Sequence, residues 1–141
     1  MPLTRNEDIA DLLTSVRTIA VVGASNNPER ASYGVMKFLI DHGCTVIPIN
    51  PGLAGQHIHG AEVKASLADA GTVDMVDIFR NSEAAGAVVD EAIASGAKAV
   101  WMQLGVVNEE AAARAEAAGL KVVMDHCPKI EIARLRLGRV A

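Results

Sequence analysis

Residues 18–34 read T-I-A-V-V-G-A-S-N-N-P-E-R-A-S-Y-G, and this stretch predicts how the chain is organised. Its first part, Thr18–Val22, is a β-branched apolar run typical of a strand buried on both faces. Gly23 follows directly, and a helical pattern begins near Tyr33. A strand that leads through a glycine turn into a helix exposes free backbone N–H groups and the positive end of the helix dipole. The stretch therefore predicts a phosphate-accepting corner.

The rest of the chain alternates between strand and helix patterns. The predicted strands cover residues 18–22, 45–50, 73–79, 99–104 and 121–124, and the predicted helices residues 5–16, 32–42, 66–69, 82–95 and 109–118. A T-x-x-E capping box at residues 4–7 starts the first helix, and Pro48 places the second strand near a sheet edge. Residues 51–65 are irregular, and residues 129–139 fit a strand or a terminal helix equally well. The alternation predicts an α/β fold: a single doubly wound, Rossmann-like parallel sheet of about five strands with helices on both faces, spanning residues 1–141.

The composition argues against several classes of protein. Half of the 141 residues are hydrophobic and the formal net charge is −4, so the chain has a core but no basic field for nucleic acid. No apolar run approaches the roughly 18 residues of a membrane span, and the N-terminal residues are polar. The two cysteines, Cys44 and Cys127, show no CxxC spacing. We therefore expect a protein of the reducing cytoplasm without membrane or nucleic-acid partners.

The end of the second strand discriminates between nucleotide cofactors. Ligands of doubly wound sheets bind beyond the carboxyl ends of the strands, and an NAD site expects an acid after the second strand to accept from the ribose hydroxyls. Here Asn50 and Pro51 occupy that place, and Gly23 is followed by Ala24 and Ser25 rather than by the glycines of a dinucleotide fingerprint. An amide tolerates a 3′-phosphate where a carboxylate repels it. The pattern favours coenzyme A over NAD, with ordinary turn chemistry as the alternative.

Five sequence blocks carry a resemblance to a known family. They are V-V-G-A-S-x-x-P-x-R-x-S-Y-G at 21–34, P-I-N-P at 48–51, V-D-I-F-R at 76–80, W-M-Q-L-G-V at 101–106 and V-M-D-H-C at 123–127. Together they resemble the small stand-alone CoA-binding proteins, a family that is also similar to the N-terminal CoA-binding domain of the succinyl-CoA synthetase alpha subunit. The resemblance runs from about residue 17 to 131. It implies a Rossmann-like fold that binds CoA or an acyl-CoA across the strand ends.

The resemblance also implies a set of ligand-binding residues. The phosphate corner comprises Gly23, Ala24, Ser25, Asn26 and Asn27; Arg30, Ser32, Tyr33 and Gly34 flank the diphosphate; Asn50 and Pro51 line the adenosine side; Phe79 and Arg80 lie beside the nucleotide; and Met102, Gln103 and Leu104 border the pantetheine path. One departure is Leu53, which stands where the synthetase has a lysine that contacts the nucleotide phosphates. The catalytic histidine of the synthetase lies outside its N-terminal domain, so no histidine here inherits that role.

Other candidate sites are weaker. Cys127 precedes Pro128, and a helix that begins there would favour the thiolate form of the cysteine. One hypothesis is therefore a redox thiol or a mixed disulfide with CoA, and the alternative is a buried, unreactive side chain. His57, His59 and Glu62 lie in a glycine-rich loop, which is poor support for a metal site. The tail cations Lys129, Arg134, Arg136 and Arg139 read as a solvated face, with an anionic partner as the minority reading.

No catalytic triad, carboxylate pair or nucleophile elbow can be argued from the residues. The sequence therefore favours a non-catalytic CoA-binding module that acts as a carrier, sensor or regulator. Two alternatives stay open: a small NAD(P)-dependent oxidoreductase and a thiol-dependent redox protein that uses Cys127. Whether a protein partner or a second copy of the chain meets the strand ends is also open.

Overall fold

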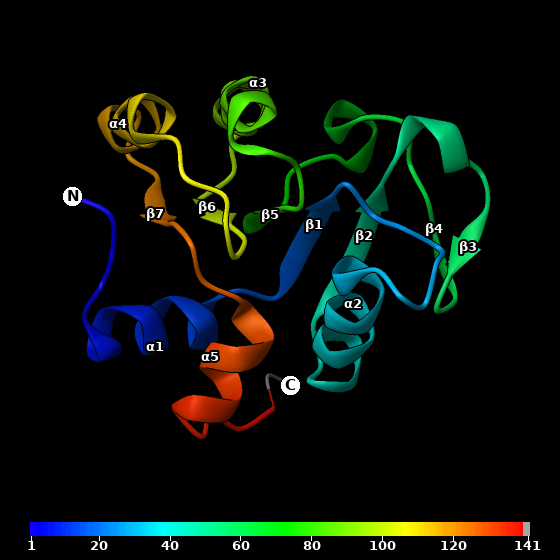
Figure 1. Ribbon diagram of the computed structural model, residues 1–141, viewed down its shortest axis with the longest axis horizontal. Helices are drawn as coiled ribbons and strands as arrows, with labels where there is room; N and C mark the ends of the chain where they lie inside the picture. Colours follow the sequence, from blue (N-terminus) through cyan, green and yellow to red (C-terminus); the bar gives the residue numbers. More distant parts are fainter. Residues whose placement is uncertain (140–141) are drawn as a thin grey trace.

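The computed structural model describes residues 1–139 and contains one central five-stranded sheet. Its strands are β1 (Thr18–Val22), β2 (Thr45–Ile49), β5 (Met75–Ile78), β6 (Ala99–Met102) and β7 (Lys121–Val123). All neighbouring strands are parallel, in the order β2-β1-β5-β6-β7 (Figure 1). The order reverses between β1 and β5, because the chain moves outward to β2 and then crosses back over β1. The topological switch point of the sheet is therefore the pair of strand ends at Val22 and Ile78.

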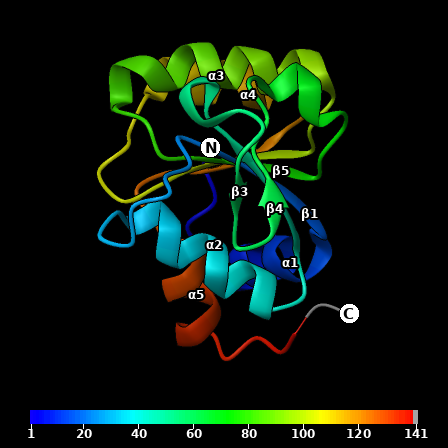
Figure 2. The same cartoon turned by 90° about the vertical axis from the view of Figure 1, so that its right-hand side faces the viewer.

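Two layers of helices cover the sheet. The helices α1 (Asn6–Ser15), α2 (Ala31–Asp41) and α5 (Pro128–Arg134) lie on one face, and α3 (Ser82–Ser95) and α4 (Glu109–Ala117) lie on the other (Figure 2). Each face has its own core, because successive strand residues point to opposite sides. In β1, Ile19 and Val21 pack toward α1, α2 and α5, whereas Ala20 and Val22 pack toward α3 and α4. The predicted doubly wound α/β fold is confirmed.

The segment predicted as irregular links β2 to β5 and covers the β2 edge. It contains two 3₁₀ turns, η1 (Pro51–Leu53) and η2 (Leu67–Ala70), and a short antiparallel hairpin of β3 (His57–Ile58) and β4 (Ala61–Glu62). Lys64 N donates to Pro48 O (2.9 Å) and Asn50 N to Lys64 O (3.0 Å), so the segment adds a bridge to the edge strand. The predicted edge position of Pro48 is confirmed.

At the N-terminal end the structure differs from the sequence prediction, and at the C-terminal end it decides between two alternatives. The capping box at Thr4 is wrong: Arg5 is the N-cap of α1 and no side chain caps the helix. Leu3 N donates to Val122 O (2.8 Å), which ties the N-terminal segment to β7 and delays the helix. The tail forms the helix α5, the second of the two alternatives. Within residues 1–139, no helix is long and apolar enough to cross a membrane.

Candidate functional site

The glycine corner lies at the switch point, where β1 and β5 end side by side. The amides of Gly23 and Ala24 both donate to Ile49 O (3.1 and 3.2 Å), which ties the corner to the end of β2. Gly23 has φ +92°, and a Cβ at this position would lie 2.3 Å from the carbonyl oxygen of Phe79. Only glycine fits at this position. Its conformation is left-handed, and a side chain would overlap the backbone of Phe79, which follows β5.

A cavity of about 390 Å³ opens at this corner. It is lined by Gly23, Ala24, Ser25, Arg30, Ala31, Ser32, Asn50 and Phe79. The lining contains one cation and no acid, and Arg30 makes no ion pair within the described residues. The amides of Ala31 and Ser32, at the start of α2, likewise find no acceptor in residues 1–139. This is the donor set that an anionic oxygen requires at a helix N-terminus.

The loop between the corner and α2 is held by its own side chains. Ser25 Oγ accepts from Asn27 N (3.0 Å), and Asn27 Oδ1 accepts from Glu29 N (3.0 Å). Asn26 and Asn27 are exposed, so the loop projects beside the cavity rather than into the core. These bonds fix the loop before any ligand arrives.

Asn50 connects the two strand ends that border the cavity. Its Nδ2 donates to Ala24 O (2.8 Å) and its Oδ1 accepts from Gly52 N (2.8 Å). A carboxylate in this place would face the Ala24 carbonyl oxygen, and two acceptors repel each other. The hydrogen bond from Asn50 Nδ2 to Ala24 O is therefore a structural reason for an amide rather than an acid after β2.

A second cavity of about 500 Å³ adjoins the first and shares Gly23 and Asn50 with it. Its other lining residues are Val22, Ile49, Pro51, Ala65, Ser66, Leu67, Arg80, Ala84, Ala87, Val88 and Glu91. The wall is mostly aliphatic and comes from η2 and the start of α3, with Arg80 as its cation. Pro51 and Arg80 were predicted from the sequence, whereas the α3 wall was missed because its Ala and Val residues read only as helix core.

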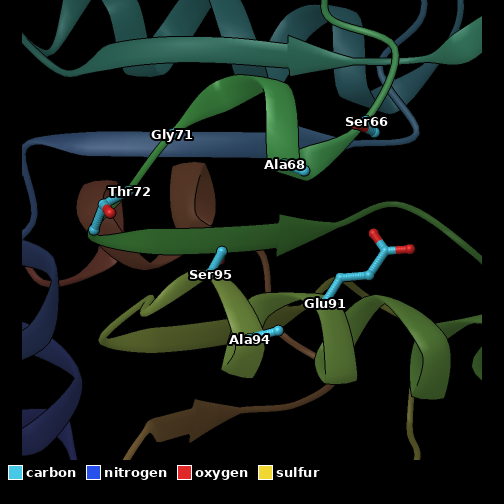
Figure 3. A pocket seen from close by; sticks show the side chains of 7 residues that line it. All are labelled: Ser66, Ala68, Gly71, Thr72, Glu91, Ala94 and Ser95. Atoms are coloured by element: carbon cyan, nitrogen blue, oxygen red, sulfur yellow. The ribbon is translucent and has the colours of Figure 1, made fainter.

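A third cavity of about 520 Å³ continues along the cleft between η2 and α3 (Figure 3). It shares Ser66 and Glu91 with the second cavity, and its remaining lining residues are Ala68, Gly71, Thr72, Ala94 and Ser95. In Figure 3 the Glu91 carboxylate points into the cleft from α3. None of the predicted site residues lines this cavity.

The remaining predicted residues lie around the corner but outside the cavities. Tyr33 and Gly34 belong to the first turn of α2; the Tyr33 carbonyl oxygen is 2.8 Å from Nε2 of His59, and their rings are 4.2 Å apart. Met102 is fully buried, Gln103 is 6 % exposed and Leu104 is 56 % exposed. Leu53 packs against the core on the α2 side. Contacts of a ligand with Tyr33, Gly34, Met102, Gln103 and Leu104 stay predictions.

The two cysteines are buried. Cys127 is the N-cap residue of α5 and only 5 % exposed, and its thiol lies in the core of the α1, α2 and α5 face. Burial raises the pKa of the Cys44 thiol. Within residues 1–139, no three His, Cys, Asp or Glu side chains are grouped as a metal site would need.

Sequence reasoning missed one functional candidate, Asp77. It lies in the middle of β5, is fully buried, and neither carboxyl oxygen has a partner in the described residues. Burial raises its pKa well above the ordinary value. The signal was present in the sequence, since an acid within the apolar run V-D-M-V-D-I-F is unexpected in a strand buried on both faces.

Comparisons with known proteins show the family of the chain. Residues 17–133 match the family described as CoA binding domain. The chain is 37% identical over 124 residues to the protein YneT of Bacillus subtilis strain 168, covering 87% of this chain and 90% of YneT.

Solved structures are similar as well. A hypothetical protein from Pyrococcus horikoshii OT3 is 37% identical with a TM-score of 0.89 over 96% of each chain. The dinucleotide forming acetyl-coenzyme A synthetase 1 of Ca. Korarchaeum cryptofilum is 26% identical with a TM-score of 0.64, over 74% of this chain and 25% of that one. The family match covers most of the chain and includes the corner, both adjoining cavities and Asp77. The chain belongs to the CoA binding domain family.

Proposed function

We propose that this protein binds coenzyme A or an acyl-CoA at the carboxyl ends of β1, β2 and β5, as a non-catalytic binding, carrier or regulatory module. The observation that carries the proposal is the cavity at the switch point. Its only charged lining residue is Arg30, and the free amides of Ala31 and Ser32 lie at the same place. A diphosphate needs this combination of a cation and unpaired N–H donors.

The second cavity suits the adenosine part of the ligand. Its aliphatic wall, which includes Leu67 and Val88, can make apolar contacts with the flat adenine ring, as the walls of ligand pockets do. Arg80 lies in the same cavity and is the cation available to the 3′-phosphate. The pantetheine arm then leaves the diphosphate toward the end of β6, where Gln103 and Leu104 stand.

The family supports CoA as the ligand class, and the synthetase similarity supports the same chemistry. The similar part of that synthetase is about a quarter of its chain. The similarity therefore supports CoA as a ligand and carries no argument about a reaction. We therefore assign no reaction to this protein.

The proposal is tested by isothermal titration of the reduced protein with CoA and with dephospho-CoA. We expect saturable binding of CoA and weaker binding of dephospho-CoA. Arg30→Ala should weaken CoA binding about tenfold, the contribution of one charge-assisted hydrogen bond. Lys37→Ala removes the same charge from α2, the helix that Arg30 precedes, at a side chain paired with Asp41, and should leave the affinity unchanged.

Arg80→Ala addresses the 3′-phosphate separately. This variant should bind CoA and dephospho-CoA with equal affinity, whereas Arg30→Ala should weaken both alike. If the wild-type protein fails to bind CoA, or if Lys37→Ala weakens binding as much as Arg30→Ala does, the proposed site is wrong.

A further inference from the structure

Two buried polar side chains beneath the strand ends lack partners, and they lie on the same face of the sheet. They are Asp77, with both carboxyl oxygens unpaired, and Gln103, with Oε1 unpaired, in the described part of the chain. Asp77 is opposite Trp101 in the β5–β6 register, and Ile78 is opposite Met102. Continuing the alternation by one residue puts Gln103 on the Trp101 side, which is also the side of Asp77.

The strand register places the two side chains within reach of each other. In neighbouring parallel strands, a residue and the residue two places beyond its partner have Cα atoms about 8 Å apart, a distance that Asp and Gln side chains span together when they point toward each other. Gln103 N also donates to Ile78 O (3.3 Å), which holds the glutamine beside the end of β5. Phe79, the residue directly after β5, lines the cavity at the switch point.

The protonation state of Asp77 decides what this pair can do. An ionised carboxylate without a partner in a core is too costly to persist, so the group takes up a proton instead. Burial alone raises the pKa of Asp77, and no neighbouring charge contributes. As a neutral acid Asp77 becomes a donor, and Gln103 Oε1 is a buried acceptor on its face that needs one.

Ionisable groups near the pair come from the helices on this face and from the segment after β7. In that segment His126 N donates to Met102 O (3.4 Å), His126 O accepts from Trp101 Nε1 (2.7 Å), and His126 Nδ1 lies 2.6 Å from Met124 O. At its buried positions α5 and its N-cap carry Glu131, which pairs with Arg134 (2.8 Å), and the thiol of Cys127. The buried residues of α1 are aliphatic, and α2 contributes Ser32 and, at its C-cap, His42. His42 follows the last turn of α2, at the amino end of the sheet, and burial lowers its pKa.

The two ends of the Gln103 amide lie in different surroundings. Oε1 is buried without a partner, whereas Nε2 makes no hydrogen bond in the described residues and is absent from the buried unpaired atoms, so it reaches the surface. The glutamine thus has a fully buried acceptor without a partner, while its amide nitrogen is not fully covered. An amide held in this orientation recognises a carbonyl oxygen.

We propose that Asp77, as a neutral acid, donates a hydrogen bond to Oε1 of Gln103 and so holds the Gln103 amide with its N–H groups toward a carbonyl oxygen of the pantetheine arm. The inference rests on the proposed function and adds a positioning residue to it. Gln103 is the ligand-contacting residue, and Asp77 acts through it. A carboxylic acid that stays neutral so that it can donate a hydrogen bond is a known use of an apolar site.

A double-mutant cycle on CoA affinity tests the coupling. Asp77→Asn keeps a donor of the same shape and should bind CoA as the wild type does. Asp77→Leu removes the donor and should weaken binding about three- to tenfold, and Gln103→Met should weaken it by a similar factor. In the Gln103→Met background, Asp77→Leu should cause no further loss. An equal loss in both backgrounds, or no loss in either, overturns the inference.

A second measurement needs no ligand. Infrared spectroscopy of the free protein at neutral pH should show the C=O stretch of a protonated carboxyl group that disappears in Asp77→Asn and shifts in Gln103→Met. If CoA does not bind but this band behaves as described, the proposed function fails, the ligand contact falls with it, and the Asp77–Gln103 pair stands. If the band is absent or does not respond to Gln103→Met, the pair is wrong whatever the titrations show.

Discussion

The two ends of the central sheet differ in whether their polar groups have hydrogen-bond partners. At the amino ends, Asp74 Oδ2 accepts from the amides of Arg17 (2.7 Å) and Thr18 (3.1 Å), and Asp74 N donates to Thr18 Oγ1 (2.9 Å). Lys98 adds an ion pair at 3.6 Å. At the carboxyl ends, the amides of Ala31 and Ser32 find no partner within residues 1–139.

The difference separates stability from binding within one sheet. The paired groups at the amino ends join β1 to β5, so their donors and acceptors already have partners within the protein. The amides of Ala31 and Ser32 at the carboxyl ends remain available, and a ligand that pairs with them stabilises the folded protein by mass action. Removing a paired polar group at the amino ends should therefore alter the free energy of unfolding, whereas removing a ligand-facing cation at the carboxyl ends should alter affinity.

The largest expected effect is that of Gly23→Ala. The new Cβ would combine a left-handed conformation with the 2.3 Å approach to Phe79 O, so we expect the free energy of unfolding to fall by about 3 kcal/mol and CoA binding to be lost. Gly55→Ala is the matched control, because Gly55 has φ +87° and open space around it. It should cost only about 1 kcal/mol. If urea unfolding gives the same loss of free energy for Gly23→Ala and Gly55→Ala, the close approach to Phe79 O has no effect on stability.

Asp77 should give the stability an unusual pH dependence. Its pKa is raised in the folded protein, so the folded chain holds a proton that the unfolded chain has released. The free energy of unfolding should therefore fall as pH rises above about 4, by up to about 1.4 kcal/mol per pH unit. Asp77→Asn should remove this slope. Urea titrations at several pH values that give parallel curves for the two proteins would contradict the account.

Asp74→Asn probes the other end of the sheet. The amide of Arg17 is the main cause of the lowered pKa of Asp74, whose stabilisation is therefore present above the unfolded pKa and lost as pH falls through the folded one. At neutral pH the variant should lose about 2 kcal/mol of stability, the contribution of hydrogen bonds to a charged acceptor. Its CoA affinity should not change. A weakening comparable to that of Arg30→Ala would break the separation between the two ends.

Cys127→Ser should have the smallest effect on binding. The thiol is buried behind the strand ends, so CoA affinity under reducing conditions should equal that of the wild type. A large loss of affinity in isothermal titration, with the fold retained by circular dichroism, would favour a ligand-contacting thiol and the redox reading of the sequence.

Local patterns explain most of what the sequence predicted. The pattern of residues 18–34 correctly predicted a strand, a glycine turn and a helix, because a buried apolar run and a glycine turn are short-range signals. Phosphate binding at this corner stays a prediction. The helix predicted from residue 109 is also found, and Asn108 caps it with Oδ1 accepting from Ala111 N (3.0 Å). Thr4 failed as a cap because a long-range bond between Leu3 and β7 decides where α1 begins.

The rest depends on packing between segments far apart in the sequence. The second cavity forms because η2 packs near α3, and the spacing of Ala84, Ala87 and Val88 shows only a helix. Gln103 was placed at the site by resemblance alone, and its unpaired oxygen becomes visible only when β5 and β6 are brought into register. The consequence of Asp77 depends on the same register.

Amide chemical-shift mapping of the reduced, ¹⁵N-labelled protein tests the central claim most directly. Titration with CoA should move the resonances of Gly23, Ala24, Ser25, Ala31 and Ser32 in a saturable way and leave those of Arg17, Thr18 and Asp74 in place. An equal concentration of NAD⁺ should move none of them. Shifts confined to the amino ends, or a response to NAD⁺ without one to CoA, would contradict a CoA site at the carboxyl ends of the sheet.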